Sequence, residues 1–155
     1  MRVADDDFYY FIRTSVKRGV RLLNARTQVL IQDEISASAP IMWRMHTNAT
    51  VTISSDGTSA TLNLDGQNMI VTMLNPPSGA VFTTNSAIRF PSFPPPPQPD
   101  QPNPDVTVLI ISVPAGTYTL EVLFNPQWPG MSASNFVTPP SVPLDNWSLT
   151  SHDPN

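Results

Sequence analysis

The chain has 155 residues, of which 40% are hydrophobic and 13% are charged, and 12 acidic residues outnumber 8 basic ones. This apolar content can fill the core of one domain, which excludes a wholly disordered chain, and no apolar run reaches the roughly 18 residues of a membrane-spanning helix. The net charge of −4 and the single lysine, Lys17, exclude a basic surface for a nucleic-acid backbone, and the lack of cysteine excludes disulfides and thiolate sites.

Short segments in which apolar and polar side chains alternate follow one another along the chain, and this period of two is typical of strands. Residues 8–17 could begin as a helix, but their aromatic and branched side chains fit a strand at least as well. Further strands are predicted at residues 27–35, 41–46, 50–53, 60–64, 69–74, 106–113 and 118–124. Turn residues, such as Asp65 and Gly66, separate them. The spacing predicts an all-β fold, an antiparallel β-sandwich over residues 8–125.

Two stretches interrupt this pattern. Residues 91–105 form a proline-rich loop within the sandwich, since its eight prolines cannot donate ladder hydrogen bonds. Its P-x-x-P segments have the shape that aromatic grooves bind, although an inert spacer is the simpler interpretation. Residues 126–155 are rich in Pro, Ser and Asn and are predicted to form an irregular tail, which side chains such as Leu144 and Trp147 could dock on the sandwich.

The chain carries few residues suited to catalysis. His46 and His152 are its only histidines, and no nucleophile motif accompanies them. Asp33 and Glu34 are adjacent on a predicted strand, so their carboxylates should point to opposite faces and not share a site. The simplest interpretation of this pair is a strand end with one solvated and one hydrogen-bonded acid. We therefore expect no catalytic residue in this chain.

His46 is the one candidate metal ligand. It shares a predicted strand face with Arg44, whereas the opposite face presents apolar side chains to the core: Ile41, Trp43 and Met45. His46 is then either a surface or interface histidine, or one ligand of a metal site whose other ligands lie outside this chain.

Two acceptor sequons for N-glycosylation begin at Asn48 and Asn146. Together with the richness in Thr, Ser and Asn, they favour an extracellular location, although residues 1–20 do not have the pattern of a signal peptide. A glycan on Asn48 would compete with a partner docked at His46 if both lie on one strand face.

A set of ordered motifs resembles a known family. The segments Val16-Lys17-Arg18-Gly19-Val20-Arg21-Leu22-Leu23, LIQDEI at 30–35, WRMHT at 43–47 and NPPSGAVF at 75–82 follow one another as in the C-terminal β-sandwich of heparinase II/III-like proteins. The resemblance covers about residues 13–125, and the proline-rich insertion departs from it.

The resemblance implies a polysaccharide lyase, which acts by β-elimination on uronic-acid polymers and combines an α/α toroid with antiparallel sheets. No toroid is expected here, because long amphipathic helical patterns are missing. The resemblance therefore implies a non-catalytic module that packs on a catalytic toroid or contacts acidic polysaccharide, with no cofactor of its own and with zinc at His46 as the one metal to consider. The alternative is a small secreted structural or adhesion domain with a polyproline interaction loop.

Overall fold

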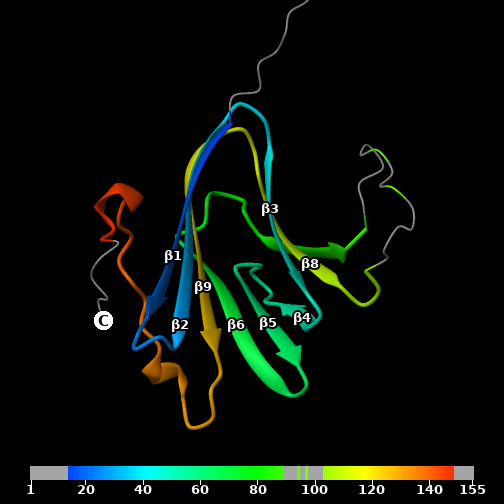
Figure 1. Cartoon of the computed structure of the whole chain (residues 1–155), viewed down its shortest axis with the longest axis vertical. Coiled ribbons are helices and arrows are strands. Elements are labelled where there is room, and N and C mark those ends of the chain that lie inside the picture. Colours follow the sequence, from blue (N-terminus) through cyan, green and yellow to red (C-terminus); the bar gives the residue numbers. More distant parts are fainter. Residues whose placement is uncertain (1–13, 89–93, 95–96, 98–102, 149–155) are drawn as a thin grey trace, which may run out of the picture.

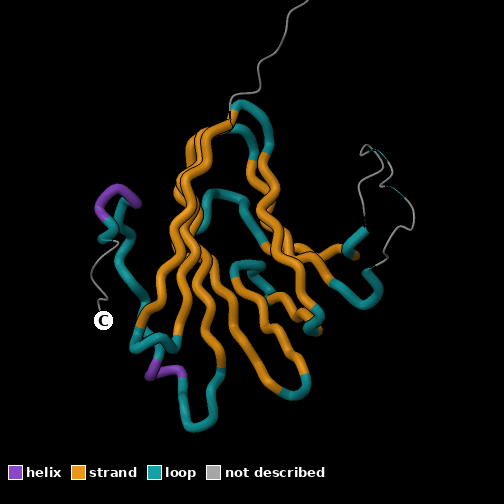
Figure 2. The backbone as a smooth tube through the Cα atoms, in the orientation of Figure 1, coloured by secondary structure: helices purple, strands orange, loops and turns teal. Residues whose placement is uncertain are grey.

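The structure, a computed structural model, describes residues 14–88, 94, 97 and 103–148 (Figure 1). The expectations for residues 8–13, for most of the proline-rich loop and for residues 149–155 lie outside these ranges. Nine strands and two short 3₁₀ turns follow one another in the described part, and strands dominate it (Figure 2). Their bounds are β1 Thr14–Leu23, β2 Gln28–Ala37, β3 Ile41–Thr47, β4 Thr50–Ile53, β5 Ser59–Leu64, β6 Gln67–Leu74, β7 Phe82–Ser86, β8 Thr107–Val113, β9 Gly116–Pro126, η1 Ala133–Asn135 and η2 Leu144–Asn146.

The strands form two antiparallel sheets, which confirms the predicted all-β sandwich. The large sheet has the order β1-β2-β9-β6-β5-β4, and the small sheet has the order β3-β8-β7. The chain passes from the small sheet to the large one between β3 and β4, at residues 48–49. Among the described strands of the large sheet, the edge strand β1 therefore pairs on one side only, with β2.

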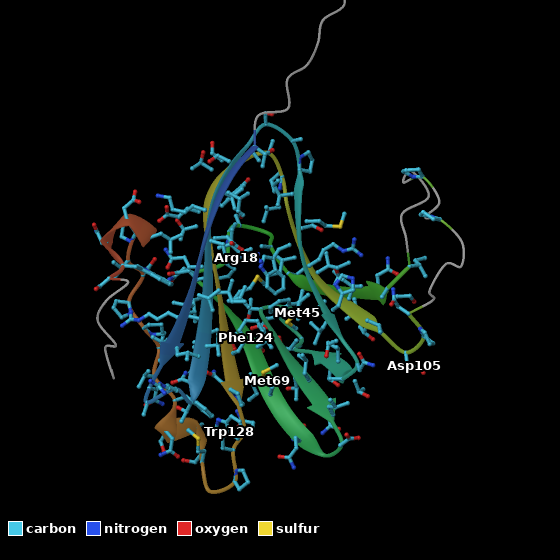
Figure 3. The ribbon with its side chains drawn as sticks, in the orientation of Figure 1. Arg18, Met45, Met69, Asp105, Phe124 and Trp128 are labelled. Carbon is cyan, nitrogen blue, oxygen red and sulfur yellow. The ribbon has the colours of Figure 1, made fainter. Side chains whose placement is uncertain are left out.

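The core lies between the two sheets, where alternate side chains of each strand meet. Figure 3 labels Met45 of the small sheet and Phe124 of the large sheet, which both belong to this apolar contact region. Trp43 is 6% exposed and Ile41 packs against the same cluster, so the predicted core face of β3 is confirmed. The central strand β8 buries both of its faces, because Leu109 and Ile111 fill the main core while Val108 and Ile110 form a second cluster behind it.

The chain after β9 packs on the outer face of the large sheet, the face turned away from the core (Figure 1). We call residues 127–148 the strap. The buried Gln28 of β2 holds it like a peptide group: its amide nitrogen donates to the carbonyl of Val137 at 3.0 Å, and its amide oxygen accepts from the Val137 N–H at 2.9 Å. The strap is irregular apart from η1 and η2, as the composition of the tail predicts, and side chains from the sheet satisfy its backbone groups.

Candidate interaction surface

The edge strand β1 carries a row of exposed apolar side chains, which we call the β1 strip: Val16, Val20 and Leu22. They are 52%, 61% and 53% exposed, respectively. Their partners across the β1–β2 ladder are Ile35, Ile31 and Val29, which contribute to the main core. Because residues opposite each other in a ladder point to the same face, the β1 strip belongs to the inner face of the large sheet. The small sheet thus leaves this end of the inner face open.

An ion pair lies within the β1 strip. Arg18 donates from Nε and from one terminal nitrogen to the two carboxylate oxygens of Asp33, each at 2.7 Å. Asp33 is 1% exposed, whereas half of the Arg18 side chain remains exposed. The hydrogen bond with Asp33 raises the pKa of Arg18 above its ordinary value, in spite of the opposing effect of partial burial. The bidentate geometry neutralises the one charge on the strip and leaves an apolar surface around it.

Asp33 and Glu34 point to opposite faces of β2, as the alternation predicts. Glu34 lies on the outer face, where its Oε1 accepts the backbone N–H of Leu144 in the strap at 2.7 Å. The interpretation of the pair as a strand end is wrong, because β2 continues to Ala37. Both acids therefore make structural contacts: Asp33 pairs with Arg18 of β1 on the inner face, and Glu34 holds the strap on the outer face.

The opposite face of β1 is covered by the strap. Lys17 forms an ion pair with Asp145, and this hydrogen bond raises the pKa of the Lys17 ammonium. Gly19 allows a close approach: a Cβ built on it would stand 2.4 Å from Leu144 Cδ2 and 2.7 Å from Trp147 Cζ3. Among the described residues, β1 thus has its inner face and its free edge available to a partner, whereas the strap covers its outer face around Gly19.

The residues singled out from the sequence lie elsewhere. His46 is exposed on the outer face of the small sheet, beside Arg44 on the same strand. β3 ends at Thr47, so Asn48 lies in the connection to β4 and not on the strand. Asn146 is exposed in η2, within the strap. The structure therefore does not bring these three candidate residues together with the β1 strip.

The described part of the chain gives His46 no partner ligands for a metal ion and includes little of the P-x-x-P segments. No group of three or more His, Asp or Glu side chains that could hold a metal ion occurs there. A zinc ion on His46 would thus need ligands from outside these residues, as the sequence-based hypothesis assumed. Of the two P-x-x-P segments, Pro94 and Pro97 are described and exposed, and their other residues lie outside the described ranges.

The Arg18–Asp33 pair and the exposed strip escaped the sequence-based prediction. The sequence analysis assigned no burial to Val16, Val20 and Leu22, since alternation identifies which side chains share a strand face but not whether a second sheet covers that face. The available signal was that Arg18 shares a strand face with these apolar residues, because an unpaired arginine is costly on a fully covered face.

Comparison with known proteins does not assign the chain. No protein-family model matches it, and no curated protein matches it. No helix of the described residues is long and apolar enough to cross a membrane.

Proposed function

We propose that this chain is a non-catalytic β-sandwich module that packs, through the β1 strip, on the α/α-toroid catalytic domain of a heparinase II/III-like polysaccharide lyase. The single observation that carries the proposal is the row of half-exposed apolar side chains on an edge strand with an open inner face. The ordered motifs from residue 16 to residue 82 support the choice of family, and the all-β fold agrees with the sheet domain that the resemblance implies.

The β1 strip has the properties of a surface that another domain covers. Fully burying a Val or Leu side chain contributes about 1.5–3 kcal/mol, so covering three half-exposed ones would contribute about 2–4 kcal/mol. Arg18 is already paired with Asp33, so the partner needs apolar complementarity here and no compensating charge. An apolar helical face of the toroid meets this requirement, because helices can pack side chains between the pleats of an uncovered sheet.

The chemistry of β-elimination would then belong to the partner domain. The reaction needs a base and an acid at the sugar ring together with neutralisation of a carboxylate. The acids that meet the β1 strip and the strap are engaged in structural contacts, Asp33 with Arg18 and Glu34 with Leu144. The proposal includes an extracellular location, which the exposed sequon asparagines Asn48 and Asn146 support.

The decisive experiment uses a polypeptide that includes any sequence encoded upstream of Met1. If the gene encodes helical repeats upstream of Met1, the joined polypeptide is compared with the 155-residue chain by hydrogen exchange at β1. We expect slower exchange of the β1 amides in the joined polypeptide, and a return to the faster exchange in the Val20→Asp variant. A matched control is Leu64→Asp, which is similarly exposed and lies on β5, near the opposite edge of the large sheet.

Two outcomes would overturn the proposal. Equal exchange of β1 in both polypeptides would show that the strip is not the packing surface. An upstream frame that encodes only a secretion signal would favour a secreted adhesion domain instead. Separately, a rise in ultraviolet absorbance from unsaturated product, when the 155-residue chain is mixed with a uronate polymer, would contradict its non-catalytic character.

A further inference from the structure

We propose that Trp128 and Arg26 form a binding site for a sugar ring that carries a carboxylate or a sulfate, at the end of the large sheet where β1 turns into β2. The ligand class rests on the proposed function, since an acidic polysaccharide is the polymer that such a module would meet. The site itself is separate from the β1 strip and is argued from its own residues.

Trp128 is a fixed and half-exposed aromatic side chain. It begins the strap directly after β9, and it is 51% exposed (Figure 3). Its indole N–H donates to the carbonyl of Thr27 at 3.3 Å, and its backbone carbonyl accepts the N–H of Met131 at 3.0 Å. The nitrogen edge of the ring is thus turned to the β1–β2 loop, and about half of the side chain stays open to solvent. An exposed, immobilised aromatic ring offers a large contact area with little loss of side-chain entropy.

The β1–β2 loop is equally fixed, in an unusual conformation. Asn24, Ala25 and Arg26 have φ angles of 50°, 54° and 68°, three successive non-glycine residues in the left-handed region. Such residues each cost about 1 kcal/mol and persist where their surroundings hold them. Here Asn24 Nδ2 donates to the carbonyl of Asn135 at 2.6 Å, and Thr27 Oγ1 donates to the carbonyl of Asn24 at 2.6 Å.

Arg26 is the charge that this loop presents. Its side chain is exposed, and it forms no ion pair or side-chain hydrogen bond with the described residues. It is the chain neighbour of Thr27, whose carbonyl accepts the hydrogen bond of the Trp128 indole, so Arg26 and the indole lie at the same end of the large sheet.

The charges around this pair favour an anion, although the chain as a whole is acidic. Residues 19–32 and 122–144 contain no Asp or Glu. Asp65, in the β5–β6 turn, is separated from β9 by β6. Among the described residues, Arg26 is thus a cation without an ion-pair partner, in a part of the surface to which they contribute no acid.

The two side chains complement two parts of one ligand. The flat indole suits the apolar C–H face of a pyranose ring, and the guanidinium can donate two parallel hydrogen bonds to a carboxylate or a sulfate on the same ring. A neutral sugar would use only the indole. Discrimination for acidic over neutral polymers therefore depends on Arg26.

The test is a titration of the purified chain followed by tryptophan fluorescence, because Trp128 is the most exposed indole while Trp43 is buried in the core. The probes are polygalacturonate, dextran sulfate and neutral dextran. We expect the acidic polymers to bind at least tenfold more tightly than dextran, with affinity falling as salt rises. Arg26→Gln should remove this preference, and Trp128→Ala should weaken binding of all three polymers at least tenfold. Because Trp128→Ala removes the reporting indole, its affinities and those of the wild type are compared by isothermal titration calorimetry. Ile88→Ala, which removes an exposed apolar side chain just after β7 of the small sheet, is the control.

Each outcome decides the proposal. A preference for polygalacturonate identifies carboxylates as the ligand group, and a preference for dextran sulfate identifies sulfates. Acidic polymers that bind Arg26→Gln as tightly as wild type would overturn the site, and so would equal affinity for dextran. This readout is independent of β1: a failed sugar site leaves the hydrogen exchange of β1 in the joined polypeptide unchanged, and failed packing at β1 leaves polymer binding unchanged.

Discussion

At the scale of single residues, the most consequential group is the carboxylate of Asp33. It lies on the inner face of the large sheet, 1% exposed, and its compensating charge comes from a half-exposed arginine on the edge strand. Burying a charge is unfavourable unless it is paired and hydrogen-bonded, so Arg18 makes this position tolerable. Removal of Arg18 and removal of Asp33 should therefore differ in their cost to stability.

We expect Arg18→Gln to destabilise the fold more than Asp33→Asn. Loss of the guanidinium leaves a buried carboxylate without its countercharge, which costs about 3 kcal/mol. Loss of the carboxylate leaves an arginine that water can reach, and we expect a cost of about 1 kcal/mol. Urea denaturation of both variants measures the difference. Equal costs would mean that Asp33 finds another donor when Arg18 is absent.

Asp56, in the β4–β5 turn, should contribute to the loss of thermal stability at low pH. Hydrogen bonds from the Ser54 hydroxyl and the Thr58 backbone N–H lower the pKa of its carboxyl. A lowered folded-state pKa stabilises the fold above the ordinary value of about 4, and this contribution disappears as the pH falls through the folded pKa. We expect Asp56→Asn to flatten the fall of Tm on acidification below about pH 4. An unchanged acid slope in this variant would contradict the assignment.

At the scale of elements, β1 has two faces with different tasks. Its outer face receives the strap, through Lys17 and the space above Gly19, while its inner face presents the β1 strip. A long edge strand is a natural place for another chain segment to pair, and the covered outer face restricts where a partner can approach. The strap thus fixes which side of β1 remains available.

We expect Gly19→Ala to loosen the strap while the sheets stay intact. The added methyl group would stand 2.4 Å from Leu144 and 2.7 Å from Trp147, closer than real Cβ contacts, so both must move. Overpacking of this kind costs about 1–3 kcal/mol. Faster hydrogen exchange and proteolysis within residues 136–148 would show it. Ser15→Ala, an exposed position on the same face of β1, is the control, and equal behaviour of the two variants would contradict tight docking of the strap.

At the scale of the whole molecule, stability comes from the contact between two sheets of unequal width. The small sheet covers the large one from β2 to β4, and the apolar side chains of both sheets pack together there. The wider sheet therefore keeps an apolar margin at β1. The same difference in width that limits the core exposes the surface on which we propose that a partner packs.

We expect a core truncation and a strip truncation to differ sharply. Ile111→Ala, at a fully buried position of β8, should lower the free energy of unfolding by about 2–5 kcal/mol. Val20→Ala, 61% exposed on β1, should change it by at most about 0.5 kcal/mol. Chemical denaturation of each variant measures both effects. A large loss at Val20 would mean that the β1 strip is part of the core and not a free surface.

Features that depend on neighbouring residues in the chain could be predicted from the sequence, whereas features that depend on strand pairing could not. The core face of β3, the doubly buried β8 and the irregular strap could be predicted, because a strand's side chains alternate with a fixed period and prolines interrupt ladders wherever they occur. The predicted strand of residues 27–35 ended two residues too early, so the strand end expected beside Asp33 and Glu34 was wrong. Strand ends depend on pairing, and β2 is extended to Ala37 by its ladders with β1 and β9.

The sequence by itself thus determined the class of fold, the positions of most strands and their apolar faces, since these depend on neighbours within a few residues. It did not predict β7, Phe82–Ser86, or the part of β1 that follows residue 17. Only the tertiary structure decided that Arg18 meets Asp33, that the strap lies on Gly19, and that Val16, Val20 and Leu22 stay exposed. Each of these facts depends on strand register and on the relative width of the two sheets. Both are set by contacts between residues far apart in the chain, which a local periodicity does not encode.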